Sequence, residues 1–354
     1  MGLLDETLGS IAPADDTTRQ QARSRLDQLT MPHRALGHVM DLAEDLAAMT
    51  GSMSPPVKRR AIAVMASDHG VCKEGVSKFP QEVTVQMVHN FCDGGAGINA
   101  LAHAAGAEVH VVDMGVAADL SELIEEGQLI DRKIGPGTAS IARGPAMSGD
   151  DAVRSLEAGI DVARQLVDSN DILAAGDMGI GNTTPSAAVG CAITGDHPAE
   201  MTGRGTGIDD DGLEKKIAVV QKSLEVNEPD ADEGLDVLAK VGGFEIGGIA
   251  GFFLGCAAAH KPVLVDGLIC TAGALIAHAL CPESADYMIA AHRSVERGHI
   301  LMLKHIGKHP LLDLELRLGE GTGAALAMPL LEAASRVLTE VSTFEEASVS
   351  QSEQ

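Results

Sequence analysis

The chain has 354 residues, of which 45% are hydrophobic, so it is long enough for one large domain with a smaller lobe. Acidic residues (51) outnumber basic ones (26), and the formal charge of −25 argues against nucleic acid or an anionic membrane as a partner. Only 2% of the residues are aromatic, which leaves few side chains to stack on exposed bases.

Six cysteines occur without a CxxC pair, so the spacing is neither a zinc nor a redox motif. The N-terminus lacks the basic region of a secretory signal. The longest apolar run, Ile246–Ala259, has 14 residues and is shorter than the roughly 20 needed to cross a bilayer. We therefore expect a cytoplasmic protein with reduced thiols and no membrane span.

In the first half of the chain, helical spacing dominates residues 1–50, and short apolar runs follow it. The expected elements are helices at Thr17–Leu29 and Pro32–Met49, a buried strand at Ala61–Ser67, a long helix at Gln81–Ala105, a second strand at Val109–Asp113, a loop or lid at 131–150 and a helix at Asp151–Ser169.

Strands and helices alternate in the second half as well. The expected elements are a strand at Ile172–Ala175, helices at Pro185–Ile193, Leu213–Val226, Leu235–Val241 and Phe244–Ala259, a strand at Val263–Val265, a helix at Leu268–Leu280, a strand at Tyr287–Ala290, strand-like spacing over Leu312–Leu318, a helix at Thr322–Leu338 and a frayed tail from Ser342. This alternation predicts a doubly wound, mainly parallel α/β sheet, whose ligands bind beyond the carboxyl ends of the strands.

The most glycine-rich turn is Gly176–Thr184, which directly follows a predicted strand. Its Gly-x4-Gly spacing is that of a phosphate-binding loop, but Asn182 stands where a nucleoside triphosphatase needs lysine. The amides at the following helix start can still hold a phosphate. A tight strand-to-helix turn without a ligand is the alternative.

A second flexible loop, Gly203–Gly207, carries Arg204, and Lys215 and Lys216 follow on the next helix. In so acidic a chain these cations are plausible ligands for an anion. A solvated surface loop explains any one of them equally well.

Motifs for metals or nucleophiles are weak. Asp68-His69-Gly70 at a strand end offers a metal ligand or an acid–base pair, although a lone histidine there more often bonds neighbouring backbone. His305 and His309 have helical spacing, but the HExxH pattern is absent. Neither Gly-x-Ser-x-Gly nor the paired acids of phosphoribosyl-pyrophosphate users occurs.

One carboxylate, Glu320, lies between Gly319 and Gly321, ahead of a predicted helix. Glycines on both sides free the backbone and clear space around the acid, so Glu320 can act as a general base in a pocket. Taken alone, the stretch is more simply a turn capped by Thr322. Its predicted place at the same sheet edge as Gly176–Thr184 favours the catalytic interpretation.

Several motifs together resemble one family, the nicotinate-nucleotide–dimethylbenzimidazole phosphoribosyltransferases, over about residues 60 to 335. They are Ser67–Val71, Phe79–Thr84, Gly176–Thr184, Gly203–Gly207, Gly243–Ile246, His292–Ser294 and Leu311–Gly323. The resemblance implies transfer of ribose 5-phosphate from nicotinate mononucleotide to 5,6-dimethylbenzimidazole, no metal, no cofactor and a homodimer.

The resemblance also implies a Rossmann-like domain with a small helical lobe built from both chain ends. We expect residues 1–50 to contribute to the lobe, 51–310 to form the nucleotide-binding domain, 311–341 to hold the catalytic loop and last helix, and 342–354 to be a flexible tail.

By the same resemblance, Glu320 is the general base, and Asp177, where many members have Glu, has a supporting role. The remaining expected site residues are Gly179, Gly181, Asn182, Thr183, Gly203, Arg204, Gly205, Lys216 and Ser294 for the nucleotide and its phosphate, and Pro80, Gln81, Met87 and Leu318 for the aromatic base.

Two other functions stay open from the sequence. A paralogue that attaches adenine or a phenolic base would carry the same motifs, because base choice depends on the shape of the slot. A catalytically silent nucleotide-binding regulator is the other, although such a protein would not need Glu320.

Overall fold

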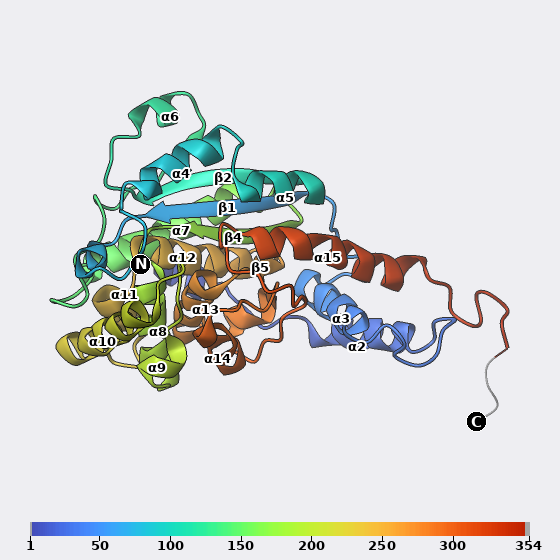
Figure 1. Cartoon of the computed structure of the whole chain (residues 1–354). Coiled ribbons are helices and arrows are strands. Elements are labelled where there is room, and N and C mark those ends of the chain that lie inside the picture. Colours follow the sequence, from blue (N-terminus) through green and yellow to red (C-terminus); the bar gives the residue numbers. More distant parts are fainter. Residues whose placement is uncertain (1, 351–354) are drawn as a thin grey trace.

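The computed structural model describes residues 2–350, which are arranged around one six-stranded sheet (Figure 1). The strand order is β3-β2-β1-β4-β5-β6, and every neighbouring pair is parallel. The strands are β1 (Arg60–Ser67), β2 (Ala107–Gly115), β3 (Leu129–Asp131), β4 (Ile172–Met178), β5 (Val263–Val265) and β6 (Met288–Ala290). The predicted doubly wound parallel sheet is confirmed, and its order reverses between β1 and β4.

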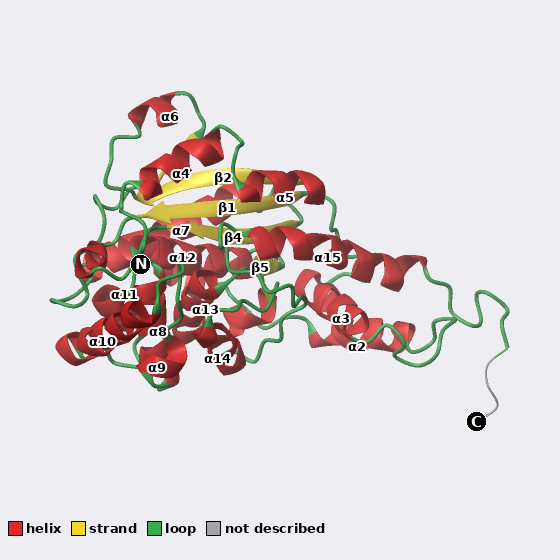
Figure 2. Ribbon diagram, in the orientation of Figure 1, coloured by secondary structure: helices red, strands yellow, loops and turns green. Residues whose placement is uncertain are grey.

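Helices cover both faces of the sheet (Figure 2). They are α1 (Leu3–Leu8), α2 (Asp16–Leu26), α3 (His38–Thr50), α4 (Val83–Cys92), α5 (Gly97–Ala105), α6 (Ser121–Glu125), α7 (Gly149–Leu166), α8 (Thr183–Thr194), α9 (Pro198–Met201), α10 (Asp210–Asn227), α11 (Gly234–Val241), α12 (Phe244–Ala258), α13 (Leu268–Leu280), α14 (Arg297–His305) and α15 (Thr322–Glu340), with 3-10 turns η1 (Gly70–Glu74) and η2 (Pro282–Tyr287). None of these helices is both long and apolar enough to cross a membrane.

The central strand β1 explains the two-sided core. All eight of its residues are buried, as expected for a parallel strand covered on both faces. Ala61, Ala63 and Met65 pack into the core shared with α7, α12 and α13, whereas Ile62 and Val64 pack into the core shared with α4, α5 and α15.

Below the sheet, α7 and α12 cross so closely that glycine is required at the contact. A Cβ atom at Gly251 would lie 1.9 Å from the carbonyl oxygen of Leu156, and one at Gly159 would lie 1.9 Å from the carbonyl oxygen of Gly248. The backbones of the two helices therefore set the distance between them.

The two chain ends meet in a helical group beside the sheet. Helices α2 and α3 pack against each other and against α15, and Figure 1 shows them next to the far end of α15. The N-terminal helix α1 is separate from this group and packs on α7 and α12.

Three local expectations differ from the structure. The long helix expected at Gln81–Ala105 is broken into α4 and α5, because Gly94 takes a left-handed conformation (φ +76°). Leu312–Leu318 forms no strand, and its alternation is interrupted by Glu315 with φ +57°. The short strand β3 lies in a stretch where no strand was expected.

The segment after Ser342, which the sequence predicts to be frayed, is hydrogen-bonded over its first residues. The amide of Thr30 donates to the carbonyl oxygen of Ser342 (3.0 Å), and the amide of Phe344 donates to that of Gln28 (2.9 Å). The last part of the expected tail, 351–354, lies outside the described residues.

Candidate active site

A cavity of about 490 Å³ opens at the carboxyl edge of the sheet, where the strand order reverses. It is lined by Val76, Ser77, Phe79, Val83, Met87, Asp177 to Thr183, Gly205, Thr206, Gly267 to Ile269, His292, Ser294, Glu296 and Arg317 to Glu320. Residues that follow the three strands β4, β5 and β6 thus meet in one space, as the turn positions in the sequence predict.

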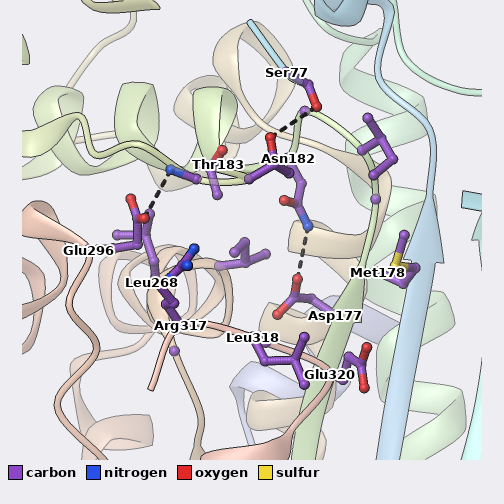
Figure 3. Close-up of a pocket in the computed structure, with 18 of the residues that line it drawn as sticks. Ser77, Asp177, Met178, Asn182, Thr183, Leu268, Glu296, Arg317, Leu318 and Glu320 are labelled. Carbon is purple, nitrogen blue, oxygen red and sulfur yellow. Dashed lines mark hydrogen bonds between the residues drawn. The ribbon is translucent and has the colours of Figure 1, made fainter. Parts of the chain in front are cut away.

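Glu320 lies in a buried and constrained position at one side of this cavity (Figure 3). Its backbone is left-handed (φ +61°), between Gly319 and Gly321, which also have positive φ. The carboxylate atom Oε2 accepts a hydrogen bond from the amide of Ile98 at 3.1 Å, in the first turn of α5. Burial raises the pKa of Glu320, and the Ile98 amide opposes this shift. One carboxylate oxygen is therefore anchored, and the group is more basic than an exposed glutamate.

The loop that carries Glu320 is tied to the sheet by Asp266, which follows β5. The Asp266 carboxylate accepts hydrogen bonds from the amides of Gly321 (3.2 Å) and Ala324 (2.9 Å), at the start of α15. A Cβ at Gly176 would lie 2.3 Å from the carbonyl oxygen of Glu320, so β4 also packs directly on the loop. The sequence analysis did not single out Asp266, because its role depends on residues more than fifty positions away.

Asp177, at the end of β4, also lines the cavity. Its Oδ2 accepts a hydrogen bond from the side-chain amide of Asn182 at 2.9 Å, and its Oδ1 is buried without a partner. Burial, with the nearby Asp266 charge as the next cause, raises the pKa of Asp177 to about 8. Asp177 is therefore mostly protonated at neutral pH and can donate a hydrogen bond into the cavity.

Opposite Glu320, the turn from Gly179 to Thr183 brings the N-terminus of α8 to the cavity. Gly179 packs directly on the end of β1, since a Cβ at Gly179 would lie 2.4 Å from the carbonyl oxygen of Ser67. Gly181 has a left-handed backbone conformation, with φ +90°. The amide of Ile180 donates to Thr84 Oγ1 at 3.1 Å and so fixes the turn. Helix-start amides in this position form a site for an anion.

Lys216 lies behind this turn and is fully buried. Its Nζ donates to Thr183 Oγ1 (2.8 Å) and to the carbonyl oxygen of Gly203 (3.2 Å). Burial lowers the pKa of Lys216 to about 8. Gly205 and Ser294 line the same side of the cavity. The structure thus brings together Gly179, Gly181, Asn182, Thr183, Gly205 and Ser294, with Lys216 in direct contact behind them.

Two expected phosphate ligands are placed differently. Arg204 does not line the main cavity, because its guanidinium binds Asp210 and the carbonyl oxygen of Ile208. Gly203 borders a neighbouring cavity rather than the main one. His69, the weak metal or acid–base candidate, is hydrogen-bonded to Glu245 (Nε2 to Oε1, 2.7 Å) and does not line the main cavity.

The third part of the cavity is apolar. Phe79, Val83, Met87, Met178 and Leu318 line it, and the side chains of Phe79 and Leu318 are more than half exposed. Met87 and Leu318 were expected for the aromatic base. Pro80 and Gln81, which were also expected, do not line the cavity, although Phe79 before them and Val83 after them do.

Several lining residues were not predicted from the sequence. Glu296 lies two positions after the recognised motif His292–Ser294, and Arg317 lies within the recognised motif Leu311–Gly323, so these motifs were the available signal. Ser77 and Leu268 carry no sequence signal of their own, because only the fold brings their loops to the cavity.

A buried carboxylate that faces an anion site across an apolar slot, at the switch point of a Rossmann-type sheet, defines a nucleotide-dependent group-transfer enzyme. A family model described as a phosphoribosyltransferase matches residues 11–349. Relatives named nicotinate-nucleotide–dimethylbenzimidazole phosphoribosyltransferase come from Syntrophotalea carbinolica (58% identity over 351 residues, 99% of both chains) and Desulfotalea psychrophila (58% over 350 residues, 99% of both).

Among solved structures, the enzyme of that name from Thermus thermophilus superposes with a TM-score of 0.90 at 47% identity, covering 96% of this chain and 100% of its own. The chain belongs to the nicotinate-nucleotide–dimethylbenzimidazole phosphoribosyltransferase family.

Proposed function

We propose that this enzyme transfers ribose 5-phosphate from nicotinate mononucleotide to 5,6-dimethylbenzimidazole, which gives α-ribazole 5′-phosphate and nicotinate for assembly of the cobalamin nucleotide loop. One observation carries this proposal. A buried carboxylate, Glu320, lies across a single cavity from the helix-start amides, and Lys216 bonds Thr183 behind those amides, so a bound nucleotide would span the two sides.

The donor phosphate would bind at the α8 side. The amides of the turn that ends at Thr183 supply hydrogen-bond donors, and Lys216 supplies a buried positive charge. Gly205 and Ser294 complete this side. The ribose then lies between the phosphate and the carboxylates, where Asp177 in its protonated form would donate to a ribose or base oxygen.

The acceptor would bind in the apolar slot beside Met87 and Leu318. Glu320 removes the ring N–H proton of dimethylbenzimidazole, and the other ring nitrogen forms its bond to C1′ of the ribose. The bond from C1′ to nicotinate breaks, and its electron pair neutralises the pyridinium nitrogen, so no acid is needed at the leaving group. Attack opposite nicotinate converts the β-linkage into an α-linkage. The raised pKa of Glu320 suits it to this role.

The test is incubation with nicotinate mononucleotide and a panel of lower-ligand bases, with nicotinate release and α-nucleotide formation as readouts. Glu320→Gln should bind the donor but lose about 10²- to 10⁴-fold in kcat, the usual contribution of a general base. Glu315→Gln removes an exposed acid from the same loop and should keep normal kcat. Turnover with none of the bases would refute the proposed function, and near-normal Glu320→Gln activity would refute the role of the base.

We also propose a homodimer. Val295, Ile300 and Leu314 are large apolar side chains that are each more than a third exposed. The amide of Val295 donates to the carbonyl oxygen of Leu316 (3.2 Å), so the two segments that carry them lie side by side. A second copy would cover this apolar surface. Light scattering should give twice the mass of the 36.6-kDa chain, and a monomer at every concentration would contradict the proposal.

The cytoplasm is the compartment we propose, as a reducing environment. All six cysteines are free. Fractionation of the native host, with the enzyme activity as marker, tests this proposal, and recovery of the activity outside the cytoplasm would contradict it.

A further inference from the structure

The phosphate side of the cavity contains an acid, Glu296, which the reaction described above does not use. Glu296 is buried and borders both the main cavity and the neighbouring one. Its Oε1 accepts a hydrogen bond from the amide of Gly205 at 2.9 Å, and its Oε2 has no partner (Figure 3). An acceptor with spare capacity therefore lies among groups that otherwise suit an anion.

The loop that contains Gly203 and Gly205 packs closely on Glu296. A Cβ at Gly203 would lie 1.8 Å from Glu296 Oε2, so the loop can approach the carboxylate only with glycine there. A Cβ at Gly205 would lie 2.8 Å from Thr183 Oγ1 and 3.0 Å from Lys216 Nζ. The carboxylate, the lysine and the start of α8 are thus gathered around one short loop.

The charges that face this loop come from several elements. Lys216 on α10 is the buried cation, and Arg204, Arg297 and Arg317 line the neighbouring cavity with Glu296. His292 lines the main cavity, and His299 accepts a hydrogen bond from the amide of Ser294 at 2.9 Å. Asp177 and Glu320 lie on the opposite side of the main cavity.

A phosphate monoester loses its second proton at a pKa of about 6, so it can arrive as a monoanion or as a dianion. A phosphate dianion bound at the Gly205 loop would have no proton to share with the Glu296 carboxylate, so the two negative charges would repel each other in a buried site. A monoanion carries one P–O–H group, and that group can donate to the spare oxygen of Glu296.

We propose that Glu296 selects the donor by accepting a hydrogen bond from a protonated phosphate monoester, and that the subsite therefore rejects anions without an acidic proton, such as sulfate. This inference rests on the proposed position of the donor phosphate. Glu296 acts on binding and does not touch the bonds that form and break.

Direct binding of inorganic phosphate and sulfate, measured by calorimetry at pH 6, tests the selectivity without turnover. The wild-type enzyme should bind sulfate at least about tenfold more weakly than phosphate, because a buried acceptor left unpaired is costly. Glu296→Gln supplies an amide N–H instead, so it should lose this preference and bind sulfate more tightly. The matched control Asp211→Asn neutralises an exposed acid in the first turn of α10 and should keep the wild-type preference.

The donor provides an independent measurement. If only the monoanion binds, KM for nicotinate mononucleotide should rise about eightfold from pH 6.5 to 7.5 in the wild-type enzyme, and much less in Glu296→Gln. The range stays below the pKa of Lys216, at about 8, and the pH profile of Glu296→Gln, which keeps Lys216, reports any loss of that charge.

Equal wild-type binding of phosphate and sulfate, or no phosphate binding, would overturn the inference. So would an unchanged preference in folded Glu296→Gln. If that variant does not fold, the wild-type anion preference and pH profile still decide the question. Failure of turnover with every base would instead refute the proposed function, because the anion measurements do not depend on the reaction.

Discussion

Removing the Asp266 carboxylate should damage catalysis from a distance, because this side chain holds the Glu320 loop. Asp266→Ala deletes hydrogen bonds to the amides of Gly321 and Ala324 (3.2 and 2.9 Å). A hydrogen bond to a buried charged group contributes about 1.5–3 kcal/mol, so the pair is worth roughly 3 kcal/mol or more. The left-handed backbone of Glu320 costs about 1 kcal/mol, and the loop would relax once it is released.

We therefore expect kcat to fall about 10²-fold, because small displacements of a catalytic group cost that much. The melting temperature should fall by about 4 °C for about 3 kcal/mol in a chain of this size. Asp266→Asn, which keeps one acceptor, should lie between the wild type and Asp266→Ala. Steady-state kinetics and thermal unfolding, on the same preparations, measure both effects.

A matched control is available at the opposite edge of the sheet. Asp171 is also buried and also accepts two backbone amides, those of Lys58 and Arg59, each at 3.0 Å. Asp171→Ala should lose similar stability and keep kcat. If Asp266→Ala retained wild-type kcat, or if Asp171→Ala lost as much, the positioning role of Asp266 would be refuted.

Two further predictions concern the buried acid and the helix crossing. The pKa of Asp177 is raised to about 8 in the folded state, whereas it is about 4 in the unfolded state. Between these pH values the folded state holds a proton that the unfolded state has lost. The contribution of Asp177 to the free energy of unfolding therefore falls as the pH rises from about 4 to about 8, and then levels off. Asp177→Asn should show a smaller fall, because the raised pKa values of Glu320 and Asp266 remain, and should retain most activity at pH 7; an unchanged pH–stability profile, from urea unfolding at several pH values, would contradict this. Gly251→Ala puts a Cβ 1.9 Å from the Leu156 carbonyl oxygen and should destabilise by about 3 kcal/mol in urea unfolding. Gly144→Ala, where a Cβ meets nothing within 4 Å, is its control, and equal stability of the two variants would refute the crossing argument.

Much of the fold could be predicted because its signals are local. Short apolar runs followed by glycine or acid mark β1, β4 and β5, and the parallel sheet then brings their turns together. The same logic predicted Glu320 at the same edge of the sheet as the turn that ends at Thr184. These are the parts of the site that one strand or one turn determines by itself.

The rest depends on contacts between distant residues. Asp266 accepts a hydrogen bond from the amide of Gly321, at the start of α15. Glu296 accepts one from the amide of Gly205, which lies ninety-one positions earlier in the chain. Arg204 was expected in the site from its charge and from its place in the glycine-rich motif Gly203–Gly207, but Asp210, six positions later, binds its guanidinium. Pro80 was expected from its place in a motif, but its neighbour Phe79 lines the cavity and Pro80 does not.

The acids around the cavity also bear on the release of products. Nicotinate in the donor carries a positive ring nitrogen beside its carboxylate, so its charges balance. Once the bond to C1′ breaks, the ring is neutral and nicotinate carries a net negative charge, whereas Glu320 has taken the proton of the acceptor and is neutral. Glu320 regains its negative charge only when it loses this proton, and the regained carboxylate then repels a nicotinate that is still bound in the cavity.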